Sequence, residues 1–131
     1  MSKLIQANVV ELEAPARQTA TFNTADIDLT NYSGPFHIIL ATSAGGGTTP
    51  TLNVKLQDAT ASGGTYADIT GAVFAEVTGA ADSTQMITLQ ADEMRGFLKV
   101  AGTITGTSPT FDMSVVGLGC LKSGRNASQA V

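Results

Sequence analysis

The sequence predicts an all-β protein: a single-domain antiparallel β-sandwich, jelly-roll-like, with an N-terminal arm. The first observation is that apolar and polar residues alternate over much of residues 52–119, as they do in strands with one buried face. The second is that clusters of Gly, Ser, Thr and Pro, the residues that turns require, break this alternation at short intervals. The 131 residues suffice for one domain with its own core.

Residues 1–17 are expected to form an arm, which folds onto the body or onto a neighbouring subunit. The alternation there is brief, and Pro15 lacks the N–H that regular pairing needs. A first strand tied to the body is the alternative. The sandwich domain is expected at residues 18–122. The polar residues 123–131 are expected to form a flexible C-terminal tail.

In the first half of the body, alternation favours short strands at residues 19–22 and 26–29. Residues 31–35, which include a Gly-Pro pair, predict a turn, and a well-buried strand follows at residues 36–41. Residues 43–50 predict a flexible loop. Its glycines precede Pro50 and a strand, whereas a phosphate-binding loop needs a Lys-Ser or Lys-Thr pair and a helix there.

The second half of the body begins with the clearest strand of the chain, residues 52–58, in which Leu52, Val54 and Leu56 share one face. A short helical turn is expected at residues 92–96 and a hairpin loop at residues 105–109. The other expected elements are strands at 66–69, 73–77, 86–89, 97–101 and 110–118, and turns at 62–64 and 79–83. Eight or nine short strands without a long helix are typical of sandwiches and barrels.

The composition indicates which classes of partner the chain can bind and in which cellular compartment it is made. The net charge is −4 and the seven Lys and Arg residues are scattered, which disfavours a nucleic-acid partner. The lone Cys120 excludes an intrachain disulfide and fits synthesis in a reducing cytoplasm. The first residues lack the apolar run of a signal peptide, and no stretch approaches the ~20 apolar residues that cross a bilayer. No membrane partner is therefore expected.

The chain offers no constellation for catalysis, so no catalytic, cofactor-binding or metal-binding residue is expected, and no enzyme. His37 is the only histidine and lies in an apolar run, which favours packing or an interface over a metal site. Asp26 and Asp28 share one face of a strand, which predicts a solvated sheet face or, at most, calcium binding. Cys120 has no partner base and is expected to be buried.

Three stretches carry a resemblance to small structural proteins of tailed bacteriophages. In those proteins a "V-K-L-Q" strand, a "G-T-Y/F-x-D-I/V" hairpin, an "R-x-Y/F-L-R/K" strand and a "G-T-S-P-x-F" loop recur in one order. The resemblance covers roughly residues 50–119, and both order and spacing agree. The matching segments here are residues 52–58 with the following Gly-Gly-Thr-Tyr-Ala-Asp-Ile, residues 95–100, and residues 106–115.

The resemblance to head decoration, or cement, proteins implies a function. It implies a structural virion protein that binds the outside of a bacteriophage capsid and stabilises it. The implied partners are the major capsid protein and further copies of the chain, as a trimer or dimer, and the implied location is the capsid surface. Two alternatives stay open: a head–tail junction or tail protein, and a carbohydrate- or receptor-binding sandwich. The absence of Trp and the presence of only two Tyr weigh against sugar binding.

Overall fold

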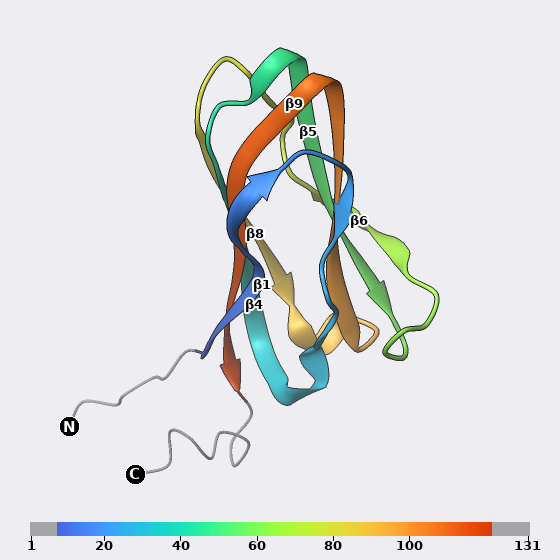
Figure 1. Ribbon diagram of the computed structural model, residues 1–131. Coiled ribbons are helices and arrows are strands. Elements are labelled where there is room, and N and C mark those ends of the chain that lie inside the picture. The colour runs from blue at the N-terminus through green and yellow to red at the C-terminus, as the bar shows by residue number, and fades with distance from the viewer. Residues whose placement is uncertain (1–7, 122–131) are drawn as a thin grey trace, which may run out of the picture.

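The computed structural model describes residues 8–121 as two antiparallel β-sheets packed face to face, which confirms the predicted sandwich (Figure 1). Every strand pairing among the described residues is antiparallel. The strands are β1 (Asn8–Gln18), β2 (Phe22–Asn23), β3 (Ile27–Asp28), β4 (Tyr32–Thr42), β5 (Gly46–Ala59), β6 (Ala67–Val73), β7 (Val77–Thr78), β8 (Ser83–Gln90) and β9 (Phe97–Leu121), with 3-10 turns η1 (Leu29–Asn31) and η2 (Ala91–Glu93).

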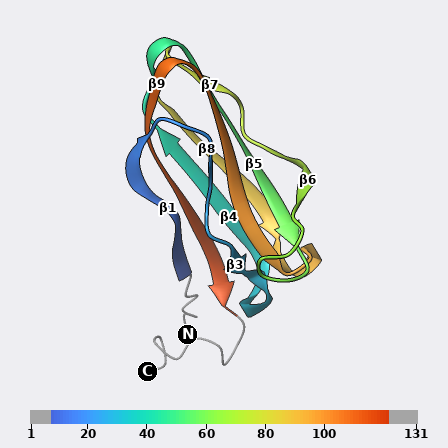
Figure 2. The same ribbon diagram turned by 45° about the vertical axis from the view of Figure 1, so that its right-hand side comes forward.

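Strand β9 belongs to both sheets. Residues 97–110 pair with β5, and residues 111–121 pair with β1 and β4. The first sheet, sheet A, therefore has the order β1, β9, β4, β8. In the second, sheet B, the first half of β9 lies between β5 and the short strands β2 and β3, while β6 and β7 pair with the other side of β5. Figure 2 shows β9 running from one sheet to the other.

The two Gly- and Thr-rich segments that were expected to be loops belong to the paired strands β5 and β9, which bend together there. This bend is called the ribbon corner below. β5 starts at Gly46 and β9 runs on through residues 105–109, so the predicted hairpin loop there is wrong, and the loop at 43–50 is shorter than expected. The register between the strands shifts at Thr48, as expected of β-bulges that bend a sheet. Gly47 and Gly106 have φ of 94° and 124°, which glycine adopts without strain.

The core lies between the sheets and follows the predicted alternation. Leu52, Val54 and Leu56 of β5 are at most 1% exposed, and Phe111, Met113 and Val115 of β9 are at most 4% exposed. On β4, Phe36, Ile38 and Leu40 are fully buried, whereas the residues between them point outward. The expectation of a buried strand at residues 36–41 therefore holds for one face only.

Phe36 fits because two positions on β9 lack a side chain. Its ring lies below Gly117 and Gly119, where any Cβ would collide with ring carbons. The ring also packs edge-on against Tyr32, with centroids 5.0 Å apart, a favourable arrangement for aromatic pairs. The pattern Gly-Leu-Gly at residues 117–119 thus makes room inside the sandwich while Leu118 faces outward.

Four local predictions need correction. Residues 8–17 form most of β1 and not a separate arm, because Val10 and Leu12 pack against the core while the backbone pairs with β9. The turn expected at residues 31–35 is an irregularity inside β4, at the left-handed Gly34. The expected strands 19–22 and 26–29 shrink to β2 and β3, and the helical turn ends at Glu93. Residues 1–7 and the predicted tail 123–131 lie outside the described residues.

Candidate interaction surface

The outer face of sheet A, called face A below, carries apolar side chains on all four of its strands. Strands buried on one side usually present polar residues on the other, so this pattern is unusual for a sheet face turned to water. The register places these side chains on the same side of the sheet. They are Val9 of β1, Val116, Leu118 and Cys120 of β9, Ile39 and Ala41 of β4, and Met86 of β8.

Face A is organised in rows that cross the strands. Val116 and Ile39 are register partners at its centre and are half-buried by their neighbours. Met86 extends this row on β8 and is 59% exposed, while Glu11 ends the row on β1. In the next row, Val9 is 67% exposed and pairs with Leu118. The centre of the face is therefore apolar and the carboxylate of Glu11 lies at its edge.

His37 lies on face A in the row of Leu118, half-buried, with Nδ1 2.8 Å from the Thr88 hydroxyl. The apolar run around His37 predicts packing or an interface, and its outward, half-buried position on β4 agrees with an interface. Among residues 8–121, no group of three or more His, Cys, Asp or Glu side chains could hold a metal ion. Cys120 is half-buried on the same face and is not the core residue that was expected.

A groove of about 590 Å³ opens at the end of face A nearest the ribbon corner. Small side chains line it, among them Ala41, Thr84 and Ser114. Its wall carries the ion pair in which Arg17 donates to both carboxylate oxygens of Asp112, at 2.8 and 3.1 Å. The hydrogen bond from Arg17 lowers the pKa of the Asp112 carboxyl.

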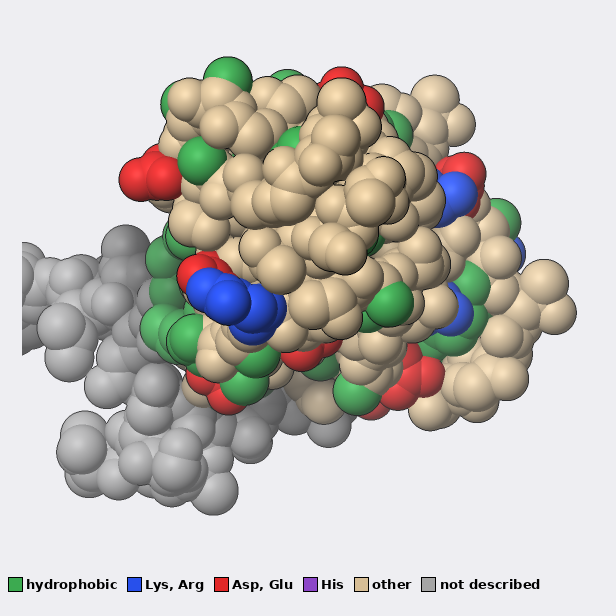
Figure 3. All heavy atoms as spheres, turned by 45° about the horizontal axis from the view of Figure 1, so that its top comes forward, with side chains coloured by type: hydrophobic (Ala, Val, Ile, Leu, Met, Phe, Trp, Pro, Cys, Tyr) green, Lys and Arg blue, Asp and Glu red, His purple; other side chains and the backbone are tan. Residues whose placement is uncertain are grey.

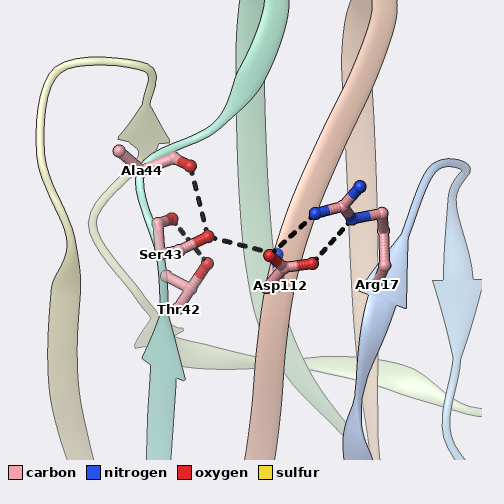
Figure 4. Close-up of polar contacts among 5 residues, drawn as sticks. All are labelled: Arg17, Thr42, Ser43, Ala44 and Asp112. Atoms are coloured by element: carbon pink, nitrogen blue, oxygen red, sulfur yellow. Dashed lines mark hydrogen bonds and ion pairs between the residues drawn. The ribbon is translucent and has the colours of Figure 1, made fainter.

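The groove wall is joined to the β4–β5 connection by further hydrogen bonds (Figure 4). The Asp112 backbone N–H donates to the Ser43 hydroxyl at 3.2 Å, and the Ser43 N–H donates to the Asp112 carbonyl at 2.9 Å. The Ser43 hydroxyl in turn donates to the carbonyl of Ala44. The groove lining therefore contains the Arg17–Asp112 ion pair, hydroxyl groups bound to backbone, and the carboxylate of Asp82, which accepts from the Ala44 N–H at 2.9 Å. Its lining residues include no aromatic ring.

The outer face of sheet B, called face B, is polar. Asn53 donates to Glu76 at 3.0 Å, and the hydroxyls of Thr51 and Thr105 bond across neighbouring strands. Lys55 and Gln57 both bond the carboxylate of Asp68, at 3.0 and 2.7 Å. Val73 is the one large apolar side chain among the described residues that is strongly exposed on this face. The two outer faces of the sandwich thus differ in chemistry.

The carboxylates of Asp26 and Asp28 do not form a joint site. Asp26 fastens the turn that precedes β6: it accepts hydrogen bonds from the Tyr66 hydroxyl at 2.6 Å, from Ser62 and from the N–H of Gly63. These bonds lower the pKa of Asp26, and burial together with the bond to Asp26 raises the pKa of Tyr66 to about 12. Asp28 instead caps η1 by accepting from the Thr30 N–H at 2.9 Å.

The end of the molecule that carries the ribbon corner has few charges. In Figure 3 most of its surface is backbone and uncharged polar side chains, with scattered hydrophobic groups and with basic groups lying beside acidic ones. This view of the described residues shows no clustered basic surface of the kind that phosphate backbones need. No helix among the described residues is long and apolar enough to cross a membrane.

The solved structures that this fold resembles include virus proteins. The VP2 subviral particle of infectious bursal disease virus superposes with a TM-score of 0.57 at 10% identity, over 95% of this chain and 35% of that one. The structure of the Gx strain of that virus gives 0.56 at 10% identity, over 91% and 32%. This chain therefore spans about a third of those capsid chains.

A third similar structure matches along its whole length. The SPBc2 prophage-derived protein YomS gives a TM-score of 0.50 at 8% identity, over 91% of this chain and 98% of that protein. No family model and no curated protein matches the sequence. At these identities the likeness establishes the sandwich fold and does not by itself establish an activity.

Proposed function

We propose that this chain is a structural virion protein that binds the outside of a bacteriophage capsid and stabilises it as a decoration protein. The observation that carries the proposal is the difference between the two outer faces. Face A has an apolar centre of Ile39, Val116 and Leu118 with one exposed apolar residue on each edge strand, and face B is covered by hydrogen-bonded polar side chains. A subunit that lies on a shell needs one face for the shell and another for water.

The physical argument begins with the exposed apolar area. Large contiguous apolar patches are rare on monomeric proteins and mark surfaces that become covered by a partner. Val9 and Met86 are each more than half exposed on face A, with Ile39, Val116 and Leu118 between them. A patch of this size is sufficient for attachment when many copies bind one shell, because multivalency converts a modest contact per subunit into durable attachment.

Two further observations support a structural role. Virus capsid proteins and a prophage-derived protein share this sandwich. The polar groups described above are used internally: Asp26 holds a turn, Asp112 holds Arg17, and His37 holds Thr88. No catalytic role is proposed for any residue, and the groove lining lacks the aromatic platforms that sugar-binding sites favour.

Electron microscopy of purified virions that carry a labelled form of this chain tests the proposal. Label distributed over the head surface is the expected result. Label confined to the head–tail junction or to the tail would instead support the alternative virion role. Virions without label would remove the proposal altogether, since the protein would then not be part of the particle.

A further inference from the structure

We infer that two copies of this chain pair through strand β8, antiparallel and across a two-fold axis near Met86. Among residues 8–121, β8 pairs with β4 alone, so its other side is an edge of sheet A in the described part of the chain. The backbone N–H and C=O groups along such an edge can pair with a further strand. This pairing names the surface through which copies of the proposed decoration protein would associate. Only the biological purpose of the dimer rests on the proposed function.

β8 lacks the features that normally prevent pairing of sheet edges. Its sequence, Ser-Thr-Gln-Met-Ile-Thr-Leu-Gln, contains no charged residue and no Pro. All eight residues pair with β4 without a register shift, so the strand is regular from Ser83 to Gln90. Natural proteins protect exposed edges with charges, prolines, bulges or very short strands.

The other edges of the described residues have that protection. β1, at the opposite edge of sheet A, carries Glu11, Glu13, Pro15 and Arg17, and its register shifts twice. In sheet B, β2, β3 and β7 have two residues each, and β6 carries Asp68 and one register shift. Within residues 8–121, β8 is therefore the one long edge strand without a protecting feature.

A second copy suits this edge because the pairing is self-complementary. In an antiparallel pair, residues that lie directly opposite each other point to the same side of the sheet. The two-fold axis must therefore lie between a residue of β8 and the same residue of the second copy, and not between two successive residues. An axis at Met86 places Thr84 of one copy opposite Thr88 of the other, and Gln85 opposite Ile87. Cross-strand threonine pairs are favourable, and an uncharged strand brings no like charges together.

The surroundings of β8 leave the edge open toward a partner. On the inner side, the Gln85 side chain exchanges two hydrogen bonds with the backbone of Ala75, at 2.8 and 3.0 Å, which closes the sandwich below the edge. On the outer side, Met86 belongs to face A and is 59% exposed. Pairing would cover Met86 with its counterpart and place the two copies of face A side by side, with the Met86 pair between two Thr84–Thr88 pairs.

Light scattering after size-exclusion chromatography of the isolated chain tests the pairing without any capsid. The expected species is a dimer, of twice the 13.4 kDa chain mass. Met86→Lys puts two ammonium groups opposite each other at the axis, so the dissociation constant should rise at least about tenfold, a like-charge cost of about 1.4 kcal/mol. Thr103→Lys, at an exposed position on face B, is the matched control and should remain dimeric.

Cysteine cross-linking tests the register, in a Cys120→Ser background. Met86→Cys should form a disulfide-linked dimer on mild oxidation, because the two residues face each other. Thr88→Cys should not, since its two copies would lie roughly 13 Å apart along the strands, beyond the reach of a disulfide. The inference is overturned if the wild-type chain is a monomer. It is also overturned if the Met86→Lys variant dimerises as the wild-type chain does and the Met86→Cys variant forms no disulfide-linked dimer. Capsid binding by a monomer would leave the proposed function standing.

Discussion

The contact between Phe36 and the glycines of β9 predicts that Gly117→Ala destabilises the fold. A Cβ at Gly117 would lie 2.7 and 2.8 Å from two carbons of the Phe36 ring, closer than real Cβ contacts allow. Phe36 is 0% exposed and is packed against Tyr32, so the ring has little room to move. Overpacking of this kind costs about 1–3 kcal/mol.

The net effect is smaller than this steric cost. Replacing Gly by Ala also lowers the entropy of the unfolded chain, which stabilises by about 0.4–1 kcal/mol where the backbone permits it. The expected loss in free energy of unfolding is therefore about 1–2 kcal/mol. For 131 residues the entropy of unfolding is roughly 0.3 kcal/mol per degree, so Tm should fall by about 4–7 °C.

Thermal unfolding followed by circular dichroism measures this shift. Ser114→Thr adds one methyl group to the outer face of the same strand, beside the groove, and is the matched control with an expected change below about 0.5 kcal/mol. The double variant Phe36→Leu, Gly117→Ala should lose about 1 kcal/mol less free energy of unfolding than the sum of the two single variants, because the new methyl group at position 117 fills space that the Phe36 ring has vacated. An unchanged or higher Tm for Gly117→Ala would refute the packing described here.

Three further predictions concern buried charge and pH. Val54→Asp should prevent stable folding by placing an unpaired carboxylate at a position 1% exposed, with loss of the β spectrum as the readout. Arg95→Ala should cost about 2–3 kcal/mol in urea unfolding, because Asp58, 8% exposed, loses the guanidinium 2.9 Å away. Lys55→Ala is its control and should cost less than about 1 kcal/mol, because its ion pair with Asp68 is exposed. Asp26 has a lowered pKa in the folded state, so its stabilising effect is present above its unfolded pKa of 3.8 and is lost as pH falls through the folded value. Asp26→Asn should therefore lower Tm near neutral pH and make little difference in strong acid; equal Tm values at neutral pH would contradict this.

Strands with one apolar and one polar face could be predicted from the sequence. β5 was recognisable because Leu52, Val54 and Leu56 alternate with polar residues, and those side chains are buried as expected. Face A was harder to foresee, because β4 and the second half of β9 carry apolar residues on both sides. A run such as residues 36–41 does not reveal which of its side chains face outward until the register is known.

The corner of the sandwich could not be predicted from composition. Gly, Thr, Ser and Pro at residues 43–50 and 105–109 favour loops, yet β5 and β9 stay paired there because both strands bend together. The edge strand β1 corresponds to the alternative expected for residues 1–17, a first strand tied to the body, and not to the separate arm. Pro15 and the phase shift argue against regular pairing, and the observed strand contains two register shifts at those places. Local propensity cannot anticipate pairing between residues about a hundred positions apart.

Binding of the chain to undecorated bacteriophage capsids tests most directly the proposal that face A attaches to the shell. Ile39→Asp places a carboxylate at the centre of face A, and Thr103→Asp places one on face B, both at outward positions that leave the core intact. With folding checked by circular dichroism, co-sedimentation should show at least about a tenfold loss of affinity for Ile39→Asp, from the desolvation of a charge against an apolar contact, and wild-type binding for Thr103→Asp. Wild-type binding by a folded Ile39→Asp protein, or loss of binding by Thr103→Asp, would contradict the account.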